Sequence, residues 1–366
     1  MEKVRIGLIG AGFIAATHAE AIRLLPDAEA VAVASRSRQS ATGFAQKWGI
    51  PHAYADYREL LEREDIDGVV VAVPNYLHAA VVQTVAGAGK HILCEKPLCL
   101  TLEEAQQMID GCRANQVKLV YGEALCYLPK YVRAKQLADE GALGDVFLVK
   151  HGEEHPGPHS AWFWDPDQSG GGVLLDMSCH SIEFARWILG RPAVKSVTAT
   201  VKTLLHKDKT RCDDHSVCVI EFDNGALAVL ENSWAKVGGL DDKCEIYGSR
   251  GNTFADVVRG NSLLTYSQPG YGYAVEKAES TQGWTFTIFE ELWTFGYLQQ
   301  MQHFVNVMKG LEEPIETAED GMEVLRIICA AYQSAGQGRR IDWPYQPPKV
   351  ARPIDLWLAT TQDTPR

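Results

Sequence analysis

Val4-Arg5-Ile6-Gly7-Leu8-Ile9-Gly10-Ala11-Gly12-Phe13-Ile14-Ala15 places an apolar run directly before a glycine-rich turn and a helix-like stretch. The run is typical of a buried parallel strand. The glycines allow a tight turn and a close approach of backbone to a pyrophosphate, which then lies at a helix N-terminus. Ala15 stands at the third glycine position, a replacement that this fingerprint allows. The segment therefore predicts a dinucleotide-binding turn.

Residues 1–122 continue the same alternation of short apolar runs and helical segments. This pattern predicts an α/β fold, an N-terminal Rossmann domain with a doubly wound parallel sheet covered on both faces. The expected strands are Val4–Ile9, Ala28–Ala34, His52–Ala55, Gly68–Val73, His91–Cys94 and Lys118–Gly122. The expected helices are Phe13–Leu25, Ser40–Trp48, Tyr57–Arg63, Leu77–Ala88 and Leu102–Asn115. Thr101 and Glu104 form a capping box for the last helix.

After Gly122 the pattern changes to a C-terminal α+β domain, residues 123–345, with a large and mainly antiparallel sheet. The expected helices are Pro129–Glu140, Asp176–Leu189, Leu292–Lys309 and Ala318–Gln337. The expected strands are Asp145–His151, Lys195–Leu204, Ser216–Phe222, Ala226–Asn232, Cys244–Tyr247, Asn252–Ala255 and Ser262–Tyr266, with a loop over 152–172. Asp223-Asn224-Gly225 predicts a hairpin turn. The tail, 346–366, is expected to be extended.

Composition narrows the class of protein. With 366 residues the chain is long for one core, so two domains are expected. Lys plus Arg number 35 against 47 for Asp plus Glu, a net charge of −12 without a basic cluster, which argues against nucleic-acid binding. No apolar run approaches the roughly 18 residues of a membrane span, and a strand follows Met1-Glu2-Lys3 directly, so neither a signal peptide nor a membrane segment is expected. Nine scattered cysteines without a Cys-x-x-Cys pair favour reduced thiols and a cytoplasmic location.

Four patches in order carry a family resemblance: Gly10–Ala15, Pro74-Asn75-Tyr76-Leu77-His78, Glu95-Lys96-Pro97 and Gly170–His180. With them, the chain resembles the glucose–fructose oxidoreductase, inositol dehydrogenase and MocA family of NAD(P)-dependent sugar oxidoreductases over about residues 4–340. The resemblance implies hydride transfer between a nicotinamide and a secondary hydroxyl or ketone of a sugar, glycoside or inositol.

Three side chains have the chemistry that such a reaction needs. Asp176 and His180 are spaced i, i+4, so at a helix start they share one face. A histidine can accept the carbinol proton, and a neighbouring carboxylate orients it and stabilises the imidazolium. Lys96 lies at the carboxyl end of a predicted parallel strand, where its ammonium can stabilise a developing alkoxide, and Pro97 holds it extended. The family's catalytic Lys, Asp and His map onto these three residues. Ser178 replaces the glycine that the family often has between Asp and His, and is expected to crowd the pocket.

Further binding residues are expected around this set. The cofactor-binding residues are expected to be Gly10, Gly12, Phe13, Ile14, Ser35, Arg36, Pro74, Asn75, His78, Glu95, Lys96 and Glu123. The substrate-binding residues are expected to be Lys96, Tyr127, His155, Trp162, Trp164, Asp176 and His180. Some alternatives stay open: Glu95 orders Lys96 or contacts the cofactor, Asn75 is a helix N-cap or also lines the nicotinamide site, and the two tryptophans stack on a sugar or belong to the core.

No metal site is expected. His151, His155 and His159 are spaced four apart, but Pro156, Gly157 and Pro158 forbid a continuous helix between them. A polar loop that approaches the substrate is the favoured interpretation of this segment.

The second strand ends Val33-Ala34-Ser35-Arg36, without the acid that usually binds the ribose hydroxyls of NAD. Ser35 and Arg36 suit a 2′-phosphate, which favours NADP, although the resemblance is compatible with either NAD or NADP.

Two other functions remain as alternatives. One is an NAD-dependent glycosidase that works by transient sugar oxidation, and the other is a non-catalytic sugar-sensing protein. Retention of Lys96, Asp176 and His180 together argues against the sensor. An aromatic segment, Tyr271, Tyr273 and Trp284, suggests room for a bulky glycoside. A wide sheet with one uncovered face predicts a homodimer or homotetramer formed through the C-terminal sheet.

Overall fold

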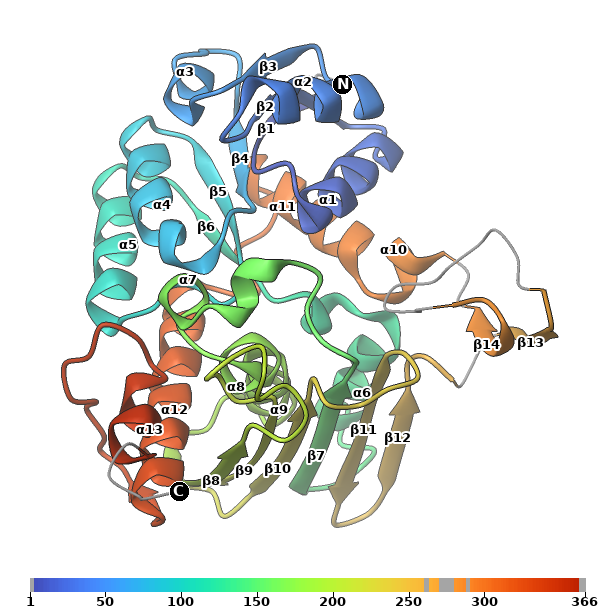
Figure 1. The fold of residues 1–366 in the computed structure, drawn as a ribbon, viewed down its shortest axis with the longest axis vertical. Helices are drawn as coiled ribbons and strands as arrows, with labels where there is room; N and C mark the ends of the chain where they lie inside the picture. Colours follow the sequence, from blue (N-terminus) through green and yellow to red (C-terminus); the bar gives the residue numbers. More distant parts are fainter. Residues whose placement is uncertain (1–2, 260–262, 270–279, 288–289, 362–366) are drawn as a thin grey trace. The chain divides into compact units, whose positions relative to one another are not determined.

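The computed structural model describes residues 3–259, 263–269, 280–287 and 290–361 (Figure 1). The chain divides into two compact units. The first comprises Met1–Ala124 and Gly296–Glu323, and the second comprises Leu125–Phe295 and Val324–Arg366. The assignment of the whole of 123–345 to a second domain is therefore wrong for Gly296–Glu323, because this segment packs into the first unit.

The first unit contains a six-stranded parallel sheet in the order β3-β2-β1-β4-β5-β6, which confirms the doubly wound Rossmann prediction. Its strands are β1 (Val4–Ile9), β2 (Ala28–Ala34), β3 (His52–Tyr54), β4 (Gly68–Val71), β5 (His91–Glu95) and β6 (Leu119–Gly122). Its helices are α1 (Phe13–Leu24), α2 (Arg38–Trp48), α3 (Tyr57–Leu61), η1 (Asn75–Leu77), α4 (His78–Gly87), α5 (Leu102–Ala114) and α11 (Tyr297–Met308). The Thr101–Glu104 capping box is present.

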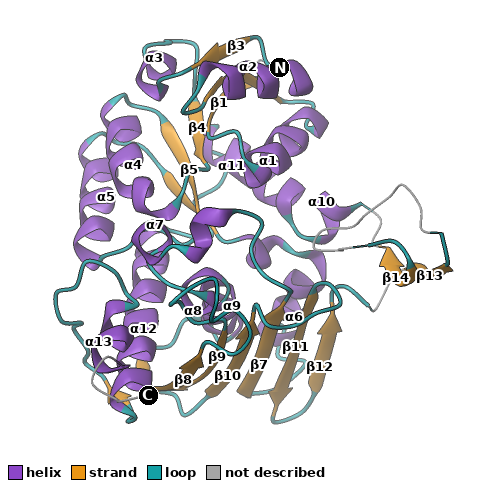
Figure 2. Cartoon of the chain, viewed as in Figure 1, coloured by secondary structure: helices purple, strands orange, loops and turns teal. Residues whose placement is uncertain are grey.

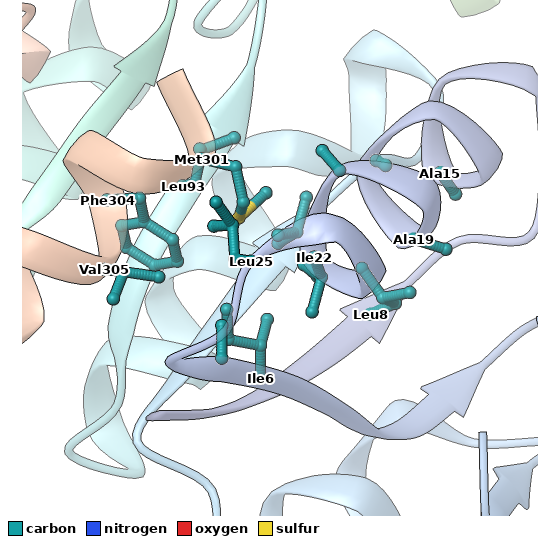
Figure 3. Packing of buried hydrophobic residues seen from close by; sticks show 14 of the residues in the cluster. Ile6, Leu8, Ala15, Ala19, Ile22, Leu25, Leu93, Met301, Phe304 and Val305 are labelled. Atoms are coloured by element: carbon teal, nitrogen blue, oxygen red, sulfur yellow. The ribbon is translucent and has the colours of Figure 1, made fainter. Parts of the chain in front are cut away.

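The core of this unit explains why α11 belongs to it. Ile6 and Leu8 of β1 and Ile22 of α1 lie in one buried cluster with Met301 and Phe304 of α11 (Figure 3). Each of these side chains is almost fully buried, and burial of a large apolar side chain contributes roughly 1.5–3 kcal/mol. A helix that is distant in sequence thus completes the nucleotide-binding domain.

The second unit contains a seven-stranded sheet in the order β12-β11-β7-β10-β9-β8-β15. Only β7 and β10 pair in parallel among its described strands, so the prediction of a mainly antiparallel sheet is confirmed. The strands are β7 (Val146–Glu154), β8 (Val194–Lys202), β9 (His215–Phe222), β10 (Leu227–Ser233), β11 (Asp241–Gly248), β12 (Asn252–Asp256) and β15 (Ile341–Asp342). Gly225, with φ of 84°, closes the predicted hairpin between β9 and β10.

Helices cover one face of this sheet, as Figure 2 shows for α8 and α9. Apart from α11, the helices after β6 are η2 (Ala124–Tyr127), α6 (Pro129–Asp139), η3 (Ala161–Trp164), α7 (Pro166–Ser169), α8 (Val173–Asp176), α9 (Ser178–Ile188), α10 (Glu291–Thr294), α12 (Ala318–Gln337) and α13 (Asp355–Thr361). Within the described residues, no helix combines the length and apolarity needed to cross a membrane.

Besides the helix Asp176–Leu189, which is described with the site, three predicted elements differ from the structure. The expected helix Leu292–Lys309 is split into α10 and α11 because Gly296 adopts a φ of 81°, which interrupts the helix. The expected strand Ser262–Tyr266 does not continue the large sheet: β13 (Leu263–Ser267) pairs with β14 (Gly283–Thr287) in a separate two-stranded sheet, and Ser262 itself lies outside the described residues. The tail is not extended throughout, because it forms α13, where Asp355 pairs with Arg352 just before the helix.

Candidate active site

The glycine turn after β1 has the geometry of a pyrophosphate site. Gly10 has φ of 125°, and a Cβ there would lie 2.1 Å from the carbonyl oxygen of Ala72, so only glycine fits. A Cβ on Gly12 would meet nothing within 4 Å, which leaves open space in front of the first turn of α1. That turn, from Phe13, has neither a side-chain cap nor an acidic residue. The N–H groups of a first helical turn and the helix dipole suit an anion, so these residues fit the diphosphate of a dinucleotide.

The contacts of the residues after β2 indicate which side chains are available to contact the adenosine ribose of a dinucleotide. The Ser37 hydroxyl caps α2 by accepting from the Ser40 N–H at 3.1 Å, and Arg38 donates to the carbonyl oxygen of Ala53. Arg36 is exposed, and its guanidinium forms no ion pair with a carboxylate in the portion of the chain described. Ser35 and Arg36 are therefore the side chains that can respond to a 2′-phosphate.

Lys96 follows β5 directly and is partly exposed, as its predicted role requires. Its backbone N–H donates to Oε2 of Glu95 at 3.2 Å, and Oε1 of Glu95 lies 2.6 Å from Nε2 of His18. Burial raises the pKa of Glu95, but the hydrogen bond from His18 and the charges of His18 and Lys96 outweigh burial and hold that pKa below its ordinary value. Both carboxylate oxygens thus contact protein groups, which favours the interpretation that Glu95 orders Lys96.

The ring of His78, a predicted cofactor ligand, contacts the backbone at both of its nitrogens. Its Nδ1 lies 2.9 Å from the carbonyl oxygen of Pro97, and its Nε2 lies 2.8 Å from the carbonyl oxygen of Val73. The ring is buried, and burial lowers the pKa of His78 despite these two backbone contacts. Since both nitrogens face backbone oxygens, the imidazole connects the segments after β4 and β5.

The remaining cofactor candidates of this unit lie at strand ends. Pro74 precedes η1 and Asn75 is its first residue, so Asn75 is not the N-cap; it is buried. Glu123 is fully buried directly after β6, where its N–H donates to the carbonyl oxygen of Tyr121 at 2.8 Å. Their predicted contacts with a cofactor remain predictions.

Asp176 and His180 are buried, but they come from two consecutive helices. The expected helix Asp176–Leu189 is broken at Met177, between α8 and α9. The N–H of His180 donates to the carbonyl oxygen of Met177 at 3.2 Å, and the thiol of Cys179 donates to the carbonyl oxygen of Asp176 at 3.1 Å. Asp176 and His180 therefore do not lie on one continuous helix as predicted, since their i, i+4 spacing spans a helix break.

The glycines before α8 are held by two residues that the sequence analysis missed. A Cβ on Gly172 would lie 1.9 Å from the carbonyl oxygen of Asp213. Oδ1 of Asp213 accepts from the Tyr332 hydroxyl at 2.7 Å and the Gly172 N–H at 3.1 Å, and Oδ2 accepts from the Leu174 N–H at 2.8 Å. Asp213 and Tyr332 thereby fix the turn that leads to Asp176. No spacing pattern connects either residue to this turn.

The burial of the Asp213 carboxylate predicts that the free energy of unfolding depends on pH. Burial raises the pKa of Asp213 from 3.8 to about 6, against the opposing effect of its three hydrogen bonds. Between these values the folded chain binds a proton that the unfolded chain has released, so stability falls as pH rises through this window, by roughly 3 kcal/mol in total. We expect the difference in unfolding free energy between wild type and Asp213→Asn to fall from pH 4 to 7 in urea titrations. An Asp213→Asn difference in unfolding free energy that does not change with pH contradicts this assignment. The control Asp223→Asn, in the exposed β9–β10 turn, is expected to give such a constant difference.

Ser178 does not crowd the pocket as expected. It is fully buried, and its hydroxyl lies 3.0 Å from the Ser216 hydroxyl and accepts from Nδ2 of Asn232 at 3.0 Å. The side chain is therefore directed at the sheet, where it anchors α9 to β9 and β10.

The three histidines of the 151–159 segment do not lie on a helix. His151 belongs to β7, where its Nδ1 lies 2.7 Å from the Ser181 hydroxyl and its Nε2 lies 3.3 Å from Asp242. His155 is buried; its Nδ1 accepts from the Gly157 N–H at 3.0 Å, and its Nε2 lies 3.4 Å from Sδ of Met177. Tyr127 is also buried. The substrate contacts of His155 and Tyr127 stay predictions.

The aromatic candidates divide into two environments. Trp164 packs against Trp234, with ring centroids 5.3 Å apart, and against His206 at 4.8 Å, which favours a core role for Trp164. Trp162 is partly exposed and stacks on Phe163 at 3.7 Å, which leaves it the better candidate for stacking on a sugar. Tyr271 and Tyr273 lie outside the described residues. Trp284 is exposed and packs against Tyr266.

Comparison with protein families gives two matches in sequence. Residues 4–123 match the oxidoreductase family with an NAD-binding Rossmann fold, and residues 131–253 match the GFO/IDH/MocA C-terminal domain. The two matches cover the glycine turn, Lys96, Asp176 and His180.

Characterised relatives align over nearly the whole chain. Myo-inositol 2-dehydrogenase of Thermotoga maritima is 30% identical over 341 residues, 92% of this chain and 98% of the relative. D-xylose 1-dehydrogenase (NADP(+)) 2 of Haloferax volcanii is 31% identical, over 86% of this chain and 92% of the relative. The solved structure of GenD2 from gentamicin A biosynthesis, in complex with NAD, superposes with a TM-score of 0.89 at 32% identity, covering 94% of this chain and 97% of that one.

Proposed function

Because this chain belongs to the GFO/IDH/MocA family of NAD-binding oxidoreductases, we propose that it transfers a hydride between a nicotinamide and a secondary hydroxyl or ketone of a sugar, glycoside or inositol. The relatives named as inositol and sugar dehydrogenases support this substrate class. The observation that carries the proposal is Lys96 at the carboxyl end of β5, in a domain whose glycine turn fits a diphosphate.

In the proposed mechanism each side chain has one task. The bound nicotinamide supplies the hydride acceptor for alcohol oxidation. His180 accepts the hydroxyl proton through its imidazole, and the Asp176 carboxylate stabilises the resulting imidazolium. The ammonium of Lys96 stabilises the negative charge that develops on the substrate oxygen. We assign Tyr127, His155 and Trp162 to the substrate side, with the Trp162 ring stacking on the sugar, and Trp164 to the core beside Trp234.

A cofactor-reduction screen tests the proposal. Purified protein is incubated with NAD or NADP and a panel of cyclitols, free sugars and glycosides, and the oxidised position of any product is read by NMR. Net reduction of the nicotinamide by a polyol supports the dehydrogenase. Aglycone release without net cofactor change indicates the glycosidase alternative, and saturable sugar binding without turnover indicates the sensor.

The preference between NAD and NADP is proposed to depend on Ser35 and Arg36. We expect Ser35→Asp to lower use of NADP relative to NAD, because its carboxylate repels a 2′-phosphate and accepts from ribose hydroxyls. Titrating both cofactors into wild type and variant measures the change, with Ser37→Asp, at the cap of α2, as the matched control. Wild-type affinity much higher for NAD than for NADP would show that this strand end was interpreted wrongly.

We propose that the chain is cytoplasmic and assembles with copies of itself through the sheet face opposite α9. On that face Val219, Val229 and Phe254 lie in one cross-strand line with Lys150 and Glu245. Val219 is 36% and Phe254 63% exposed, whereas the neighbouring positions under the helices are buried. Covering such apolar side chains favours a second copy, and light scattering on the purified chain tests for a homodimer or homotetramer.

A further inference from the structure

Glu95 is fixed by donors at both of its carboxylate oxygens. His18 binds Oε1 at 2.6 Å, and the backbone N–H of Lys96 binds Oε2 at 3.2 Å. A carboxylate held at both oxygens has one orientation, and it also fixes the backbone where Lys96 begins. The side chain that sets this orientation is His18, because the other donor belongs to the segment that is being oriented.

His18 reaches Glu95 from a different part of the domain. It is the sixth residue of α1, the helix whose N-terminus carries the glycine turn, and it is fully buried. In the sheet, β4 lies between β1 and β5. The pair therefore joins the nucleotide-binding helix to the end of a strand that is not adjacent to β1.

The groups around Glu95 indicate that His18 supplies a hydrogen-bond donor to this carboxylate. Besides His18, Lys96 and His78 from α4 act on its charge, and Glu95 in turn helps to raise the pKa of the buried Cys94 thiol, after the larger effect of burial. A carboxylate only accepts hydrogen bonds, so Nε2 of His18 must carry the proton. The edge of the His18 ring meets Tyr297 of α11, with centroids 6.3 Å apart, and Nδ1 makes no hydrogen bond with any part of the chain that is described. The hydrogen bond to Glu95 is thus the polar contact that His18 provides.

We propose that His18 is a positioning residue for Lys96, because it holds the Glu95 carboxylate ionised and oriented beneath the lysine backbone. This inference rests on the proposed role of Lys96 in hydride transfer. Without the donor at position 18, a buried Glu95 takes up a proton more readily or turns away, and the Glu95–Lys96 backbone loses its fixed geometry. A glutamine at position 18 has an amide N–H that can restore the donor, whereas a leucine cannot.

The test compares His18→Leu, His18→Gln and the exposed-histidine control His52→Leu. In cofactor-free protein with ¹³C-labelled glutamate carboxyls, the Glu95 signal, assigned with Glu95→Gln, titrates at a higher pH in His18→Leu than in wild type. His18→Gln brings the midpoint back. In the hydride-transfer assay, His18→Leu lowers kcat about tenfold to a hundredfold with a smaller change in KM, and His18→Gln recovers most of that loss.

Two results overturn the inference. One is a Glu95 midpoint in His18→Leu that equals the wild-type midpoint. The other is a fall in kcat that His18→Gln does not recover, which is what a merely structural role gives. A double variant His18→Leu/Glu95→Gln should be no slower than the slower single variant, since the residues act as one unit. Absence of wild-type hydride transfer refutes the proposed function instead, and the carboxyl titration still decides the His18–Glu95 pair.

Discussion

Replacement of Lys96 by alanine is expected to lower turnover by about a hundredfold or more while nicotinamide cofactor binding persists. The ammonium is proposed to act on charge that exists only as the substrate oxygen becomes an alkoxide, so its loss raises the barrier without weakening the ground state to the same extent. Removal of one such contact typically costs two to three orders of magnitude in kcat. Single-turnover kinetics with the substrate found in the screen measures the loss, and fluorescence titration measures cofactor affinity.

Two further variants sharpen this result. Lys96→Arg keeps the positive charge but cannot give up a proton in the accessible pH range. A large loss in Lys96→Arg indicates proton transfer or exact placement by the lysine, and near-normal turnover indicates charge alone. Lys90→Ala, just before the opposite end of β5, is the matched control and should behave as wild type. Near-normal turnover in Lys96→Ala removes the lysine from the mechanism.

The first half of the fold could be predicted because its signals are local. Each strand of the parallel sheet is an apolar run followed by turn residues, and the glycine turn after Ile9 is informative because it lies between such a run and a helix-like stretch. The Thr101–Glu104 capping box and the turn at Gly225 have equally local causes: a side chain that bonds to nearby backbone, and a positive φ. Such features depend on residues within a few positions of each other, and the sequence displays them directly.

The missed features depend on contacts between distant residues. The pattern of α11 indicates an amphipathic helix, but it does not indicate that Met301 and Phe304 bury themselves against β1 and α1. Asp213 binds the Gly172 N–H across 41 positions, and His18 meets Glu95 across 77. The backbone contacts of His78 are equally invisible in the sequence. Its two backbone partners, at Val73 and Pro97, become visible only when β4 and β5 lie side by side.

The break at Met177 has a similar origin. The sequence predicts one helix over Asp176–Leu189, yet two helices form, and the first, α8, begins earlier, where the glycine turn is bound to Asp213. The position of Asp176 is thereby set by a tertiary contact, since the turn before it is fixed from outside the helix. The i, i+4 spacing of Asp176 and His180 can be read directly from the sequence. Periodicity alone does not reveal that one helix ends and another begins between them.

His180→Ala is expected to lower turnover in the oxidation direction by two to four orders of magnitude, the usual effect of a positioned general base. We also expect the pH profile to change shape. For wild type, the oxidation rate should rise as pH passes through the ordinary histidine range, because only the neutral imidazole accepts the hydroxyl proton. In the variant that rise should disappear, since the titrating group is gone.

The shape of the profile separates base catalysis from a structural role of His180. This residue is buried at the start of α9, so its loss also leaves a cavity that lowers turnover at every pH by one factor. A uniform loss with the rise retained would assign the base to another group. His180→Gln fills the space without a group that titrates, and should lack the rise just as alanine does.

Asp176→Asn should keep the rise but move it to lower pH, because a neutral amide no longer stabilises the imidazolium. His215→Ala, on β9, should leave rate and profile unchanged. Small primary isotope effects at all pH values would show that hydride transfer does not limit the rate, and single-turnover measurements would then be needed to expose the proton-transfer limb.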